Sequence, residues 1–159
     1  MDFELDDSLD RVDRDVLWDF MSSQAYWGRW RSREDLERQL AGAWRVVGAY
    51  ERPGGRMIGF ARAFSDGVAS AYLADVFTVP EARGHGVGKA LVRTMIDEGP
   101  GQEFRWMLHT DDAHGLYRGF GFAEPDQTYM ERRASGSRAQ APEGGVQRQS
   151  GAAGSQPTS

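Results

Sequence analysis

The sequence predicts an α+β domain whose strands run in mixed directions. Apolar residues recur at helical spacing near the N-terminus and again after residue 86, whereas other runs alternate or stay apolar over the length of a strand. These patterns follow one another as helices, a β-hairpin, a strand, and then helix, strand, helix and strand. That order is typical of an α+β fold with a mixed sheet.

Two helices are expected first. Apolar residues at helical spacing predict a helix over residues 8–22, with Asp7 or Ser8 as its N-cap. Ser32, with Asp35 three residues later, resembles a capping pair, so a second and shorter helix is expected to begin there.

A hairpin and a long strand are expected next. Residues 44–50 and 57–64 are expected to pair, because the Arg-Pro-Gly-Gly stretch between them has turn chemistry. Residues 71–79 form a nearly unbroken apolar run that is interrupted by Asp75. Such a run suggests burial on both faces and a central place in the sheet.

The second half alternates helices and strands. Val87, Leu91 and Met95 share the apolar face of an expected helix, and residues 104–110 alternate as a strand. A short helix is expected to follow and to end at a glycine, and residues 129–132 could form a last strand.

The chain is expected to hold one folded domain, residues 1–133, followed by a tail. Residues 134–159 are rich in glycine, serine, alanine and glutamine, and Val146 is their one large apolar residue. Such a segment buries too little surface to offset the entropy of ordering it, so it is predicted to be disordered.

Composition excludes several classes of function. The chain has 24 acidic and 19 basic residues among 159, and its net charge of −5 argues against nucleic-acid binding. Its lack of cysteine excludes disulfides and thiolate nucleophiles. No apolar run is long enough to span a membrane, and the acidic N-terminus does not resemble a secretory signal. A cytoplasmic protein without nucleic-acid or membrane partners is therefore expected.

A glycine-rich loop precedes the helix that begins near Val87. Gly84, Gly86 and Gly88 recur at two-residue spacing in the stretch PEARGHGVGKAL. The first N–H groups of a helix have no intrahelical partner, and the helix dipole makes this end attractive to phosphate. The spacing fits neither the Walker pattern nor the dinucleotide fingerprint. A glycine-rich turn before a core helix is the alternative interpretation.

The flanking residues resemble a known superfamily. Residues 79–91 are similar to the acetyl-CoA loop of the GNAT N-acetyltransferases, whose core pattern Arg/Gln-x-x-Gly-x-Gly/Ala is filled by Arg83, Gly86 and Gly88. Residues 106–122, WMLHTDDAHGLYRGFGF, resemble a later motif in which a helix carries Ala-x-x-Leu-Tyr and closes in Phe-Gly-Phe. The chain resembles small stand-alone members of this superfamily from about residue 12 to residue 133.

The resemblance implies a detailed fold and a cofactor. The sheet would be mixed and mostly antiparallel, with about six to seven strands, four flanking helices and a splay between the fourth and fifth strands. Acetyl-CoA would enter that splay, its pantetheine arm pairing with strand backbone. The residues expected to contact it are Phe77, Thr78, Val79, Arg83, Gly84, His85, Gly86, Val87, Gly88, Lys89, Thr110 and His114. Thr110 stands where many relatives carry asparagine.

The resemblance also implies direct transfer of an acetyl group from acetyl-CoA to a primary amine of a small molecule or peptide. Tyr117 matches the position that often protonates the leaving thiolate, and a phenol with a pKa near 10 is protonated at neutral pH. A packed helix aromatic is the alternative for Tyr117. Asp75 is a candidate general base or substrate anchor, or else a structural carboxylate bonded to a turn or an arginine. A backbone N–H near Phe77 or Val79 would bind the oxyanion.

The acceptor site is expected between the first two helices. Tyr26, Trp27 and Trp30 lie on this connection and could surround a cationic amine, or could cap the core. Either a monomer or a homodimer is compatible with the resemblance. A non-catalytic acyl-CoA-binding protein that uses the same cleft for sensing is the rival hypothesis.

Polar residues also gather before and within the last helix. His109, Asp111, Asp112 and His114 lie close together in sequence, and Asp112 is expected to cap that helix. No metal is expected, because the superfamily resemblance does not require one.

Overall fold

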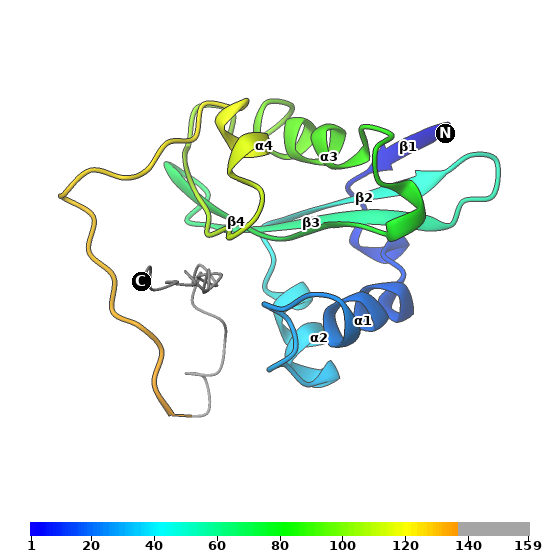
Figure 1. Cartoon of the computed structure of the whole chain (residues 1–159), viewed down its shortest axis with the longest axis horizontal. Helices are drawn as coiled ribbons and strands as arrows, with labels where there is room; N and C mark the ends of the chain where they lie inside the picture. The colour runs from blue at the N-terminus through cyan, green and yellow to red at the C-terminus, as the bar shows by residue number, and fades with distance from the viewer. Residues whose placement is uncertain (137–159) are drawn as a thin grey trace, which may run out of the picture.

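The computed structural model describes residues 1–136. A five-stranded sheet lies between two layers of helices (Figure 1). All but the first three residues of the expected tail, residues 134–159, lie outside the described part of the chain.

The strands lie side by side in the order of the sequence. They are β1 (Phe3–Asp6), β2 (Arg45–Glu51), β3 (Met57–Ser65), β4 (Ser70–Thr78) and β5 (Arg105–Met107). The pairs β1–β2, β2–β3 and β3–β4 are antiparallel, whereas β4 and β5 are parallel. The predicted α+β class and mixed, mostly antiparallel sheet are confirmed.

The expected number of strands is wrong, because residues 1–136 form five strands and not six to seven. The sequence patterns do not predict β1, and residues 129–132 form no strand. Within the latter segment Tyr129 is 40% and Met130 92% exposed. Side chains that bury so little surface give this segment little reason to join the sheet. It lies outside the five-stranded sheet (Figure 1).

Four α-helices flank the sheet, as predicted. α1 (Arg14–Ser23) and α2 (Arg33–Ala41) cover one face, and α3 (Val87–Ile96) and α4 (His114–Arg118) lie over the other (Figure 1). Two short 3₁₀ turns, η1 (Leu9–Arg11) and η2 (Pro80–Ala82), complete the described elements.

The start of the first helix differs from the prediction. Asp13 caps α1 by accepting hydrogen bonds from the N–H groups of Asp15 and Val16, each at 3.0 Å. Ser8 makes no cap hydrogen bond. A carboxylate at Asp13 satisfies two otherwise unpaired donors, so the α-helix begins after it. The capping box of Ser32 and Asp35 at α2 is confirmed.

β4 contains a bulge at Asp75. Phe60 pairs with Phe77 and Arg62 with Ala74, so Ala61 faces two residues of β4. Asp75 adopts φ 53°, a left-handed conformation that is rare for residues other than glycine. The extra residue reverses the alternation of side chains beyond it. Phe77 therefore packs on the α1–α2 side of the sheet, whereas residues before the bulge follow the opposite alternation.

β4 and β5 part soon after they meet. Their pairing runs from Ser70 opposite Arg105 to Tyr72 opposite Met107, and β4 continues alone to Thr78. β5 is shorter than the expected strand over residues 104–110. This separation agrees with the splay predicted between the fourth and fifth strands.

Candidate active site

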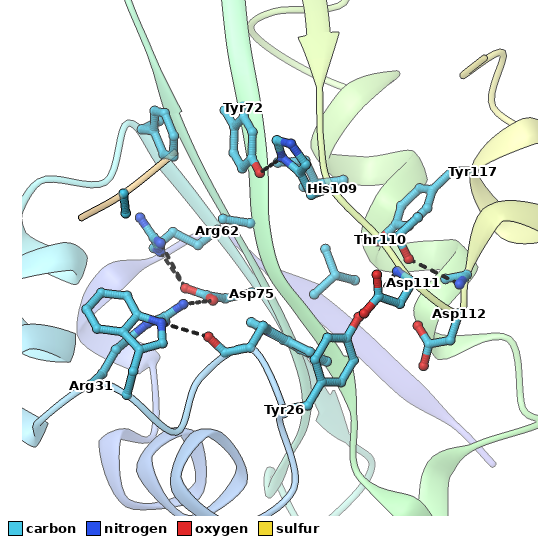
Figure 2. Close-up of a pocket in the computed structure, with 18 of the residues that line it drawn as sticks. Tyr26, Arg31, Arg62, Tyr72, Asp75, His109, Thr110, Asp111, Asp112 and Tyr117 are labelled. Atoms are coloured by element: carbon cyan, nitrogen blue, oxygen red, sulfur yellow. Dashed lines mark hydrogen bonds and ion pairs between the residues drawn. The ribbon is translucent and has the colours of Figure 1, made fainter. Parts of the chain in front are cut away.

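Two cavities meet beside the point where β4 and β5 part. The first, of about 370 Å³, is lined by the α1–α2 loop, β3, β4, the segment after β5, α4 and residues 131–134 (Figure 2). The second, of about 400 Å³, is lined by β5, α4 and the residues that follow it. Both are large enough for a small-molecule site. They share Tyr72, His109, Thr110 and Tyr117.

Tyr117 lies at the junction of the two cavities. It is 8% exposed, and its ring meets Phe122 edge-on at 5.7 Å between centroids. Burial, reinforced by Asp112 and Tyr26, raises the pKa of Tyr117 to about 12. The phenol is therefore protonated throughout the physiological range and can donate its proton. Tyr117 can therefore both pack against Phe122 and donate a proton, so its two expected roles are compatible.

Thr110 begins the α4 segment. Its Oγ1 accepts a hydrogen bond from the N–H of Ala113 at 3.1 Å. The expectation that Asp112 caps this helix is wrong, because Ala113 is the N-cap of α4 and no side chain makes a cap hydrogen bond there. Asp112 and His114 are exposed instead. Asp111, which lines the first cavity, donates its backbone N–H to the Tyr26 hydroxyl at 3.3 Å.

The glycine loop leaves open space in front of α3. Gly84 and Gly86 have φ of 78° and 82°, and a Cβ at either position would meet no atom within 4 Å. At Gly88 a Cβ would lie 3.5 Å from Thr78 Oγ1. The left-handed backbone favours glycine at the first two positions. The loop thus gives a ligand free access to the first N–H groups of α3.

Charged side chains border this loop. Arg83 Nε donates to the carbonyl of Thr78 at 3.4 Å, and His85 Nδ1 lies 2.9 Å from the carbonyl of Arg83. Arg83, His85 and Lys89 are exposed, whereas Val87 is buried in the core. Val87 can therefore offer a ligand its backbone but not its side chain.

The backbone hydrogen bonds at the end of β4 decide which N–H groups are available to bind an oxyanion. The N–H of Val79 donates to the carbonyl of Ile58 at 3.0 Å, and its carbonyl accepts from Ala82 at 3.0 Å. The suggestion that the Val79 N–H binds an oxyanion is therefore wrong, because that donor is occupied. The alternative near Phe77 stays a prediction. The Phe77 ring stacks on Phe20 at 4.0 Å, so its side chain belongs to the core.

Asp75 is held by two arginines. Arg31 Nη2 donates to Oδ1 at 2.8 Å, and Arg62 Nε and Nη2 each lie 2.9 Å from Oδ2. Burial alone would raise the pKa of Asp75, but charge attraction and hydrogen bonds from both guanidiniums lower it below its usual value. The expectation that Asp75 acts as a general base is therefore not supported. The geometry agrees with the alternative, a structural carboxylate bonded to arginine.

Arg31 and Arg62 were not identified from the sequence. Their side chains are each 7% exposed, and Arg31 Nε and Nη1 are buried without a hydrogen-bond partner among the described residues. Arg62 did carry a signal, because it stands inside the otherwise apolar run of β3. A buried charge there requires an opposite charge nearby. Asp75 is the one charged residue in the apolar run of the neighbouring strand, β4.

The three expected acceptor-site aromatics line the first cavity. The ring of Trp27 meets Tyr26 edge-on at 4.9 Å, and Trp30 Nε1 donates to the carbonyl of Trp27 at 3.0 Å. The guanidinium of Arg31 lies over Trp30, with Cζ 5.4 Å from the ring centroid. The aromatic residues that were expected to surround a cationic amine therefore already have a cation of the protein, Arg31, beside them.

A hydrogen-bonded histidine lies where the cavities join. Tyr72 Oη is 2.5 Å from His109 Nδ1, and His109 Nε2 is 3.5 Å from a carboxylate oxygen of Glu131. Burial, with smaller contributions from nearby acidic groups, raises the pKa of Tyr72 to about 12. The phenol is therefore protonated at neutral pH and shares a hydrogen bond with His109 Nδ1.

No group of three or more histidine, cysteine, aspartate or glutamate side chains in residues 1–136 is arranged to hold a metal ion. His109, Asp111, Asp112 and His114 form no such group despite their proximity in sequence. Within the same described part, no helix has the length and apolar character needed to cross a membrane.

A sequence profile described as the acetyltransferase (GNAT) family matches residues 11–122. The chain belongs to the GNAT family of acetyltransferases. The match includes the glycine loop and the α4 motif, the two segments that carry the resemblance in the sequence. Acyl transfer is the activity that this family membership indicates.

Individual relatives agree with the family. A candidate acetyltransferase of Gibberella zeae is 30% identical over 105 residues, which are 65% of this chain and 57% of that protein. The chain thus spans less than two thirds of that relative. A candidate GNAT acetyltransferase of Xanthomonas campestris pv. campestris is 32% identical, with a TM-score of 0.76 over 84% of this chain and 94% of that one. A candidate acetyltransferase of Deinococcus radiodurans R1 is 27% identical, with a TM-score of 0.64 over 82% and 89%.

Proposed function

We propose that this GNAT protein is an N-acetyltransferase that moves the acetyl group of acetyl-CoA directly to a primary amine. The observation that carries the proposal is the position of Tyr117, a buried and protonated phenol where two cavities meet beside the parted strands. One cavity can then receive the amine while the thioester lies in the gap between β4 and β5.

The donor would bind along β4 and the glycine loop. The pyrophosphate would accept hydrogen bonds from the first N–H groups of α3, with Arg83 and Lys89 offsetting its charge. The open space beside Gly84 and Gly86 supports this assignment. The pantetheine arm would lie against the part of β4 that β5 leaves unpaired.

The chemistry would need one attack, and protons must move before and after it. The neutral amine nitrogen attacks the thioester carbonyl carbon, the carbon–sulfur bond breaks, and the thiolate takes the proton of Tyr117. The proton that the nitrogen loses on becoming an amide then returns to the Tyr117 phenolate, which restores the phenol. The amine must first lose a proton, and Asp111 and Asp112 are the carboxylates at the Tyr117 end of the cavity that could receive it through water. Asp75 does not serve here because both of its oxygens are bonded to arginine.

Calorimetry with acetyl-CoA, CoA and ATP tests the donor assignment. Binding of acetyl-CoA and CoA is expected, and tight ATP binding without CoA binding would contradict it. Thiol release across a panel of amines then separates an enzyme from the rival, a non-catalytic acyl-CoA sensor. A sensor would bind acetyl-CoA and release thiol no faster with any amine than without one.

A further inference from the structure

One end of the first cavity holds two buried guanidiniums but one buried carboxylate. Arg31 and Arg62 share the single carboxylate of Asp75, so two positive charges and one negative charge leave one positive charge. No second carboxylate in residues 1–136 forms an ion pair with either guanidinium. Glu131 and Arg133, from the segment after α4, line the same cavity and add one charge of each sign. A buried charge without a counter-ion is costly, so the site favours an anion.

Arg31 also has unused hydrogen-bond donors. Its side chain is 7% exposed, and its Nε and Nη1 have no partner among the described residues. A buried donor that makes no hydrogen bond is destabilising, and more so when it is charged. The Trp30 ring lies beside this guanidinium, with 5.4 Å between Cζ and the ring centroid. Planar carboxylates match guanidinium geometry well.

The opposite charge lies at the other end of the cavity. Figure 2 shows Arg31 and Arg62 on one side and Asp111, Asp112 and Tyr117 on the other. Tyr117 marks the reacting end, because the proposed thiolate receives its proton there. An ammonium group would be attracted to the carboxylates at that end before it loses its proton.

We infer that the acceptor is an amino carboxylate, a small molecule or chain end that carries a primary amine and a carboxylate on one short skeleton. The carboxylate binds at Arg31 beside the Arg62–Asp75 pair, and the amine lies at the Asp111–Asp112 end next to Tyr117. The inference rests on the proposed function and specifies its acceptor. A cavity of about 370 Å³ is near the lower end of the range for ligand sites, which suits such a small molecule.

Matched acceptors test this inference on the unaltered protein. Alanine, 5-aminovalerate and lysine are each compared with their amides, which keep the amine and lose the negative charge. A peptide that ends in lysine, compared with its amidated form, distinguishes a chain end from a free amino acid. We expect kcat/KM about 10- to 100-fold higher for the free acid of at least one pair, the range of a hydrogen bond to a charged group. Equal or faster acetylation of the amides overturns the inference and leaves the proposed function in place.

Variants of Arg31 separate recognition from folding. Arg31→Gln should raise KM for the preferred acid about 10- to 100-fold more than it raises KM for the amide, and Arg31→Lys should restore part of that difference. Arg29→Gln is the matched control, since Arg29 is an exposed arginine of the same loop that bonds the carbonyl of Ser23. An equal loss for acid and amide would assign Arg31 a structural role and overturn the inference.

Three further outcomes distinguish failure of the inference from failure of the proposed function. If Arg31→Gln does not fold, the comparison of acids and amides on the unaltered protein decides the question. If the unaltered protein binds no acetyl-CoA, the proposed function fails and the inference with it. If it binds acetyl-CoA but acetylates no amino carboxylate of the panel, the inference alone is overturned.

Discussion

The guanidinium of Arg31 donates to Asp75 Oδ1 at 2.8 Å and so joins the α1–α2 loop to the middle of β4. Arg62, on the neighbouring strand β3, holds the other oxygen of the same carboxylate. The bulge at Asp75 lies where both arginines meet it. One buried carboxylate therefore connects the loop that lines the first cavity to the sheet that shapes it.

Asp75→Asn should destabilise the fold. The substitution leaves two buried guanidiniums without a negative partner, which costs about 3–5 kcal/mol of unfolding free energy at neutral pH. Because Asp75 has a lowered pKa in the folded chain, its contribution is complete above its unfolded pKa and is lost as pH falls through the folded value. Chemical denaturation of both proteins from pH 7 to pH 3 measures this. The difference should be constant above about pH 5 and shrink in acid, and a difference that does not change with pH would contradict the charge assignment.

Gly86→Glu should abolish binding of CoA. The new side chain would place a negative charge in the open space before α3, where the pyrophosphate is proposed to lie. Gly55→Glu is the matched control, since Gly55 also has a positive φ and a Cβ there would meet no atom within 4 Å, but it lies in the β2–β3 turn. Calorimetry should show binding by the control and none by Gly86→Glu. Equal affinity of the two variants would remove the loop from the donor site.

Tyr117→Phe should lower kcat and leave acetyl-CoA affinity nearly unchanged. Loss of a general acid typically lowers the rate about 10²- to 10⁴-fold. Tyr50→Phe is the control, because Tyr50 is also a buried tyrosine and lines neither cavity. Its hydroxyl is buried without a partner among the described residues, so its removal should not harm stability. Steady-state thiol release measures both variants, and unchanged turnover by Tyr117→Phe would remove this residue from its proposed role.

Asp13→Ala should destabilise α1, whereas Ser8→Ala should not. Asp13 accepts two backbone hydrogen bonds at the helix start, and loss of such a cap costs about 1 kcal/mol. Ser8 makes no side-chain cap hydrogen bond. Thermal or chemical unfolding of both variants tests where the helix begins. A larger effect at Ser8 would favour the longer helix that the apolar spacing predicts.

Features with local causes could be predicted from the sequence. The capping box at Ser32 and Asp35, the β2–β3 hairpin and the glycine entrance to α3 each depend on residues a few positions apart. The motif around Tyr117 likewise located a residue that lines both cavities. Short-range chemistry of this kind is visible in the order of the residues.

Features that depend on distant contacts could not be predicted in the same way. β1 is four residues long, too short for its own sequence pattern to predict a strand. It is a strand because it pairs with β2. The side chain at the bulge, that of Asp75, is bonded to Arg31, which lies 44 residues away in the sequence. Both oxygens of Asp75 are bonded to arginine, a geometry that favours the structural role over the role of a base.

The most direct test of the central claim is mass spectrometry of an amine panel after incubation with acetyl-CoA and the protein. We expect that one amine gains a single acetyl group, that free CoA appears in equal amount, and that Tyr117→Phe slows both. Calorimetric binding of acetyl-CoA with no acetylated amine, and no release of CoA above the protein-free rate, would contradict the proposed transfer.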